Sequence, residues 1–169
     1  MEINALPRYD MTDNPTGCCP RFDPDNWDSE NLHFRDKLFV HARTRSLAHM
    51  PLNMGPVFRK TFSAIKDADA QSDTDFIVMS RDQSAWSAEH LFAVNKKVPG
   101  QEMVQLTGDF ITKVFEGAYR KVPQWCEELS EGVKAEGKDV KQTYFFYTTC
   151  PKCAKTYGKN YVVGIAEVE

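Results

Sequence analysis

Residues 109–119 read Asp-Phe-Ile-Thr-Lys-Val-Phe-Glu-Gly-Ala-Tyr, and this stretch leads from a strand into a helix. Apolar residues favour a strand before Gly117, and the helix that follows is expected to run to about Ala135 with one apolar face. Gly137 comes just after that helix and is typical of its end, because glycine readily adopts a left-handed backbone. The stretch therefore predicts a strand followed by an amphipathic helix.

The same order of elements is expected twice along the chain. The second half has strand-like segments over 103–106, 110–115, 144–148 and 161–168, with the helix after the second of them. The first half has strands over 38–45, 76–80 and 86–98, and a helix from Gly55 to about Ala68. Three matches align the halves at offsets that grow slowly, as small insertions would produce: Phe58 with Tyr119, Phe76 with Tyr144, and His90 with Asn160.

The turn around Gly117 resembles that of the gyrase-inhibitor-like, effector-binding or SOUL-like, small-molecule-binding domains. In that family a strand leads into a His-x-Gly-Pro-Tyr-like turn and a helix. Gly117 and Tyr119 match this pattern, whereas Phe115 stands where the histidine often is and Ala118 where the proline is. Gly55-Pro56 resembles the same turn in the first half.

The resemblance covers about residues 38–169 and implies an α+β fold of two strand–helix–strand–strand halves related by a pseudo-twofold axis. It also implies an antiparallel sheet with both helices on one side and a ligand cleft between the halves on the other. Family members include drug-binding effector domains, and some similar proteins hydrolyse reactive xenobiotics. Phe145 stands where cation-binding members often carry a glutamate, which argues against the family's cation site here. The segments with Cys18-Cys19 and with Cys150 and Cys153 are additions to the family pattern, so the resemblance points to a cysteine-bearing branch.

The chain divides into an N-terminal arm over residues 1–34 and one domain over 35–169, with halves at about 37–99 and 101–169. The arm is dense in proline and glycine, which break helices and strands. We expect it to be extended and to dock on the domain through Phe22, Trp27 and Phe34.

Four of the five cysteines form two pairs at opposite ends of the chain, Cys18-Cys19 and Cys150-Pro-Lys-Cys153. Two such pairs supply the four sulfur ligands of a structural zinc site, with the second pair in a knuckle-like hairpin. Adjacent cysteines tend to point apart, so one of the first pair could be replaced by a histidine: His33, His41 or His49. A redox or incidental disulfide and free buried thiols are the alternatives.

Aromatic residues are expected to line the cleft, since flat apolar molecules bind by burial and stacking. The candidates all lie in the duplicated region: Trp86, Phe92, Phe115, Tyr119, Tyr144 and Tyr147. Glu116 and Glu89 are the candidate catalytic residues, because a carboxylate desolvated among aromatic rings can act on water as a general acid or base. Exposed surface carboxylates are the alternative for both.

Composition excludes several classes of protein. The formal net charge of −3 argues against a nucleic-acid binder, and no apolar run is long enough to predict a membrane span. The N-terminus lacks a signal-peptide pattern, so we expect a cytoplasmic protein.

The leading prediction for function is binding of a small apolar or aromatic molecule, with or without its hydrolysis. A non-catalytic effector-binding or protein-inhibitor module that acts through a protein partner is the first alternative. A thiol redox protein is the second.

Overall fold

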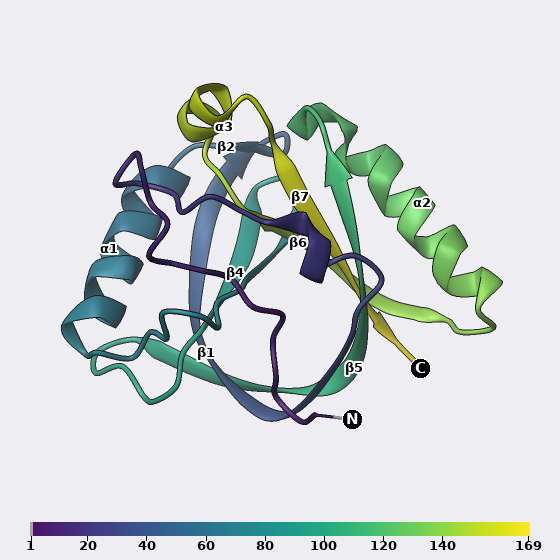
Figure 1. Cartoon of the computed structure of the whole chain (residues 1–169), viewed down its shortest axis with the longest axis horizontal. Coiled ribbons are helices and arrows are strands. Elements are labelled where there is room, and N and C mark those ends of the chain that lie inside the picture. Colours follow the sequence, from purple (N-terminus) through teal and green to yellow (C-terminus); the bar gives the residue numbers. More distant parts are fainter. Residues whose placement is uncertain (1) are drawn as a thin grey trace.

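The computed structural model describes residues 2–169, which form a closed antiparallel barrel with helices outside it (Figure 1). The sheet order is β2-β1-β4-β3-β6-β7-β5, and β5 pairs again with β1 to close the barrel. The strands are β1 (Asn31–Leu47), β2 (Met50–Pro51), β3 (Val78–Ser84), β4 (Ser87–Ala93), β5 (Glu102–Glu116), β6 (Val140–Tyr147) and β7 (Tyr161–Val168). The helices are α1 (Met54–Asp67), α2 (Val122–Ala135) and α3 (Pro151–Tyr157), with short 3-10 turns η1 (Pro24–Asn26) and η2 (Tyr119–Lys121).

The predicted duplication is confirmed by the order of elements. Apart from the two-residue β2 and the short α3, the first half is β1-α1-β3-β4 and the second is β5-α2-β6-β7, so each half is a strand–helix–strand–strand unit. The long pairing of β1 with β5 joins the halves on one side, and β3 meets β6 on the other through Ser80 and Phe145. The mixed α+β class and the antiparallel sheet agree with the prediction.

The barrel wall has an outer face under the helices and an inner face that points away from them. Side chains alternate between the two faces along each strand. On β6, Phe145 packs with Trp125 and Leu129 of α2, whereas Tyr144 and Phe146 belong to the other apolar cluster. The inner face is therefore the side of the sheet that carries Tyr144 and Phe146.

Residues 31–34 of the predicted arm, with Phe34, belong to β1. The part before β1, residues 2–30, is called the arm from here on, and it crosses the barrel between α1 and α2 (Figure 1). Its side chains Tyr9, Phe22 and Trp27 are buried, and all three rings lie within 6.2 Å of the ring of Phe146 between centroids. The hydroxyl of Thr112 on β5 donates to the carbonyl of Trp27. Aromatic side chains of the arm thus occupy the inner face where the sequence predicted an open aromatic cleft.

Three local expectations were wrong. Residues 102–116 form one continuous strand, because Gly108 stays in the ladder, where a Cβ would lie 3.0 Å from Glu167 Oε1. The strand expected over 86–98 is shorter, ending at Ala93. Residues 151–157 form α3 instead of a hairpin, since Pro151 suits the first helical turn and Gly158, at φ 75°, ends it.

Candidate functional site

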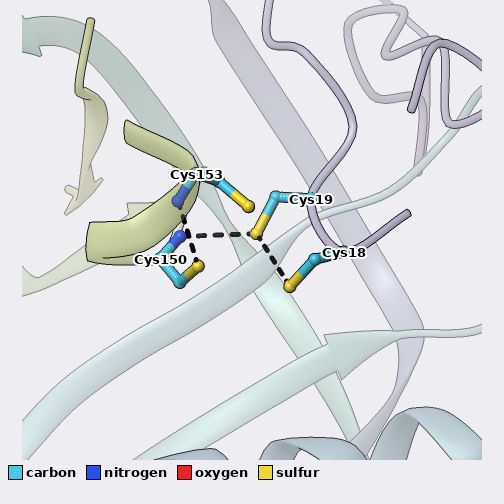
Figure 2. A group of neighbouring side chains, drawn as sticks. All are labelled: Cys18, Cys19, Cys150 and Cys153. Atoms are coloured by element: carbon cyan, nitrogen blue, oxygen red, sulfur yellow. Dashed lines mark hydrogen bonds between the residues drawn. The ribbon is translucent and has the colours of Figure 1, made fainter. Parts of the chain in front are cut away.

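The four paired cysteines meet at one end of the barrel, where the arm passes α3 (Figure 2). We call Cys18, Cys19, Cys150 and Cys153 the thiol cluster, and their Sγ atoms all lie within 4.8 Å of one another. Cys150 is the N-cap of α3, and its sulfur accepts a hydrogen bond from the backbone N–H of Cys153 at 3.4 Å. The backbone N–H of Cys150 donates to the sulfur of Cys19, also at 3.4 Å.

A turn in the arm directs both adjacent cysteines toward α3. The hydroxyl oxygen of Thr16 accepts hydrogen bonds from the backbone N–H groups of Cys18 and Cys19, at 3.2 and 3.4 Å. The two sulfur atoms consequently lie 3.7 Å apart, and the expectation that neighbouring cysteines point apart does not hold here. Tyr157 of α3 donates its hydroxyl hydrogen to the carbonyl of Cys19 at 2.6 Å, which ties the turn to the helix.

The thiols of the cluster differ in acidity. Burial raises the pKa of Cys19 and, to a smaller extent, that of Cys18. Burial also acts to raise the pKa of Cys153, but hydrogen bonds with Thr16 and the other thiols outweigh it and bring the value down to about 7. The cluster therefore favours a thiolate at Cys153 near neutral pH.

The three histidines considered as replacement ligands lie elsewhere. His33 contacts Asp109, and His49 contacts Asp82. His41 contacts two carboxylates on the inner face of the barrel. The cysteines alone make up this candidate metal site.

A second cluster of polar side chains lies on the inner face of the barrel, centred on Glu89 of the first half and extending to Glu102 on β5. Glu89 is 9% exposed, and its carboxylate accepts hydrogen bonds from His41 Nε2 at 3.0 Å, Arg81 Nε at 2.5 Å and Gln83 Nε2 at 3.1 Å. Burial acts to raise the pKa of Glu89, but the bonds from His41 and Arg81 prevail and hold it below its usual value. Glu89 is therefore ionised at neutral pH, as a buried charge with partners can be.

The imidazole of His41 lies between two carboxylates of different exposure. Its Nε2 faces Glu89, and its Nδ1 lies 3.1 Å from Glu102 Oε2. The side chain of His41 is 7% exposed, whereas that of Glu102 is 58% exposed. One nitrogen thus contacts a buried carboxylate, while the other contacts a carboxylate that is mostly exposed to solvent. We call His41, Arg81, Gln83, Glu89 and Glu102 the carboxylate cluster.

Comparison with known proteins assigns the chain to a family. The sequence model of a family described as bacterial hydrolase matches residues 9–168, nearly the whole chain. The chain belongs to the bacterial hydrolase family. Among curated proteins, no match was found.

Solved structures share the fold of this family member. An uncharacterised conserved protein from Listeria innocua superposes with a TM-score of 0.61 at 10% identity, covering 84% of this chain and 92% of the other. A hydrolase from Listeria innocua gives 0.57 at 11% identity with the same coverage. The C-terminal domain of EcmrR gives 0.56 at 10% identity, covering 85% of this chain and 98% of that domain. At such identities the likeness shows the fold alone.

The structure separates the two predicted catalytic carboxylates of this chain. Glu89 lies in the carboxylate cluster. Glu116 is exposed at the end of β5, and its nearest cation is the ammonium group of Lys159 at 3.6 Å. Glu116 is therefore the solvated carboxylate that was considered as the alternative.

The six aromatic candidates do not form one cleft. Trp86 is 60% exposed in the turn between β3 and β4, whereas Phe92 packs under α1 against Phe58. Phe115 stacks on Trp125 of α2 at 5.2 Å. Two candidates do meet, since the ring centroids of Tyr119 and Tyr147 lie 5.7 Å apart. Tyr144 lies separately, on the inner face. Burial raises the pKa of all three tyrosines.

The partners of Glu89 were missed from sequence because they come from two other strands, β1 and β3. His41 is on β1 and Arg81 on β3, and their positions opposite or near Glu89 follow from strand register, which the sequence does not give. The alternation of faces could have placed Arg81 and Gln83 together, since they are two residues apart on one strand.

One hollow of about 520 Å³ lies away from both clusters, between the arm and the start of β1. Leu6, Asp25 and His33 are among its lining residues. It is not the aromatic cleft that the sequence predicted. No helix within residues 2–169 combines the length and the apolar character that a membrane span requires.

Proposed function

We propose that this chain hydrolyses a small molecule on the inner face of the barrel, with His41 and Glu89 activating the water. One observation carries the proposal: the imidazole of His41 lies between the buried carboxylate of Glu89 and the exposed carboxylate of Glu102. Membership of the bacterial hydrolase family supports the reaction class.

The chemistry follows from the two nitrogens of His41. Glu89 accepts a hydrogen bond from the Nε2–H group, and this leaves Nδ1 as the atom that takes a proton from water. Glu102 contacts Nδ1 in this structure, and its exposed side chain can move aside for that water. Water gives its proton to Nδ1 as its oxygen bonds to the electrophilic carbon, and the ring then returns that proton to the leaving group.

Arg81 and Tyr144 supply the remaining roles. The Nε–H of Arg81 is used by Glu89, and the rest of its guanidinium group can stabilise negative charge that develops on the substrate. Tyr144 lies on the same face, close enough for the charge of Arg81 to act on its pKa. Tyr144 would contact a small apolar or aromatic substrate, which is the ligand class that the inner face of aromatic residues favours.

The experiment compares wild type, Glu89→Gln and Glu116→Gln on a panel of small aryl esters and amides. We expect Glu89→Gln to lower kcat/KM by about 100-fold or more, since general-base groups typically contribute that much. Glu116→Gln is the matched control, an exposed carboxylate changed in the same way, and should stay within about twofold of wild type. Equal activity in wild type and Glu89→Gln would refute the assignment.

A non-catalytic binding module is the second candidate, favoured by the arm that already fills part of the inner face. In that case the chain would bind one of the panel compounds by calorimetry, and the compound would be recovered unchanged. Slow conversion of a bound compound would exclude this candidate.

We also propose that the thiol cluster binds one zinc ion, as a structural site. Four thiolates complete the tetrahedral coordination of zinc and leave no open position for a substrate or water, so this site takes no part in the hydrolysis. A cytoplasmic location suits this proposal, because a reducing compartment keeps paired thiols free to bind metal.

A further inference from the structure

We infer that the metal in the thiol cluster clamps the arm onto the inner face of the barrel. The inference rests on the zinc site proposed above and is independent of the hydrolysis. In this role the ion holds in place the segment whose aromatic side chains cover part of the inner face.

The thiol cluster has the size and the chemistry of a four-sulfur metal site. Zinc–sulfur bonds of about 2.3 Å place the sulfur atoms of a tetrahedral site roughly 3.8 Å apart. Cys18 and Cys19 already have their sulfur atoms at 3.7 Å, and no pair in the cluster exceeds 4.8 Å. Small side-chain shifts are enough to close the cluster around one ion, and thiolates select zinc or iron over magnesium or calcium.

Hydrogen-bond donors also surround the sulfur atoms, and such donors stabilise the negative charge of a metal-bound thiolate. Backbone N–H groups point at the sulfurs of Cys19 and Cys150, and the hydroxyl of Thr16 lies 3.4 Å from the sulfur of Cys153. Outer hydrogen bonds of this kind orient metal ligands. Four thiolates this close would repel one another without a cation, so a divalent ion favours the assembled cluster.

The cluster is the attachment of the middle of the arm to α3. Towards its N-terminus, the arm is held by the backbone bond from Tyr9 to Thr74, 2.9 Å long. Towards β1 it is held by the bond from Ser29 to Thr112, 3.0 Å long. Between these points, the turn at residues 16–19 reaches α3 through the cluster and through the hydroxyl of Tyr157.

This attachment has consequences for the inner face. Phe22 comes three residues after Cys19, and its ring lies 6.2 Å from that of Phe146 and 6.0 Å from that of Tyr161. A turn fixed to α3 limits how far Phe22 can move from these partners. Loss of the ion should therefore loosen the arm first, while α2, which packs on the other face, remains ordered.

The test measures metal content and backbone hydrogen exchange on the same samples. Protein purified without a metal-affinity tag is analysed for metals, and its amide exchange is compared before and after chelation. We expect one zinc or iron ion per chain, and exchange in residues 9–30 that becomes about tenfold faster or more after chelation. Exchange in residues 122–135 is the internal control and should not change.

Two serine variants give the matched comparison. Cys150→Ser removes a ligand, whereas Cys126→Ser changes a cysteine of α2 outside the cluster. Cys150→Ser should lose the metal and show the fast exchange of the arm, and Cys126→Ser should behave as wild type. If Cys150→Ser fails to fold, chelation of the wild-type protein still decides the question.

Each failure has its own signature. A chain purified without metal that binds no added zinc refutes the metal site, and reversible oxidation of its thiols in pairs would point to redox chemistry instead. Bound metal whose removal leaves the exchange of residues 9–30 unchanged refutes the clamp alone. Neither readout uses a substrate, so the outcome is separate from that of the hydrolase proposal.

Discussion

The two halves of the duplication share a backbone plan but present different side chains on the inner face. The first half contributes the hydrogen-bonded polar residues His41, Arg81 and Glu89. The second half contributes Phe146 and neighbouring apolar residues, which pack against the aromatic rings of the arm. The first half therefore carries the proposed base and its buried carboxylate. The second half carries the packing against the arm and adds only Glu102 and Tyr144 to the candidate site.

The difference shows how a repeated scaffold can be specialised by a segment outside the repeat. A buried charge is tolerated only where partners satisfy it, and the strands of the first half supply those partners to Glu89. An exposed aromatic surface favours association, and the arm covers that of the second half. The thiol cluster joins the arm to α3, which belongs to the second half.

The largest effect is expected from removing the histidine of the first half. His41→Asn removes the nitrogen that takes the proton from water, so kcat should fall by roughly 10²- to 10⁴-fold. Glu102→Gln changes the exposed partner of the same ring and should lower kcat by less than about tenfold. Steady-state kinetics on the best substrate of the ester and amide panel would measure both values of kcat. An unchanged kcat in His41→Asn would show that His41 is not the catalytic base.

For the arm that covers the second half, the expected effect of a substitution is on stability. Trp27 is fully buried against Phe146, so Trp27→Ala should lower the free energy of unfolding by about 3–5 kcal/mol. Trp86→Ala is the matched control, because Trp86 is 60% exposed and should change that free energy by less than about 0.5 kcal/mol. Urea denaturation measures both, and similar values for the two variants would show that the arm does not contribute to the core.

The smallest effect concerns His90, which points to the outer face of the first half. Burial lowers its pKa from 6.5 to about 4, and the hydroxyls of Ser80 and Thr44 contact its two nitrogens. As the pH falls, His90 thus binds a proton near pH 6.5 in the unfolded chain but only near pH 4 in the folded chain. Stability therefore falls as pH falls through this window, by about 1.5 kcal/mol between about pH 6.5 and 5.

The same urea titration at several pH values tests this prediction. The wild type should lose more stability between about pH 6.5 and 5 than His90→Gln, which has no titrating ring at that position. The lowered pKa of Glu89 adds a loss only at more acidic pH, below its usual value of 4.5. Parallel curves for the two proteins would exclude a neutral, buried His90.

Much of the fold was predictable from sequence because its signals are local. Apolar periodicity located both long helices, and the paired cysteines predicted that two distant segments meet. The helix at residues 151–157 was missed although Pro151 and Gly158 are ordinary start and end signals for one. There the interpretation of the cysteines as a hairpin knuckle outweighed the local evidence.

The candidate site was less predictable because it depends on register and on long-range packing. His41 and Glu89 are 48 residues apart, and only the pairing of β1 with β4 brings them together. The arm was expected to dock through aromatic residues, but nothing local indicates that Phe22 and Trp27 pack against Phe146 on the inner face.

The most direct test of the division between the halves measures two quantities on two variants. Turnover and the free energy of unfolding are determined for Glu89→Gln and for Phe146→Leu, with the wild type alongside. We predict that Glu89→Gln loses turnover by about 100-fold or more while it remains folded, and that Phe146→Leu loses stability while its turnover at about 25 °C stays within a few-fold of wild type. A Glu89→Gln protein with wild-type turnover, or a Phe146→Leu protein that is stable but inactive, would contradict the account.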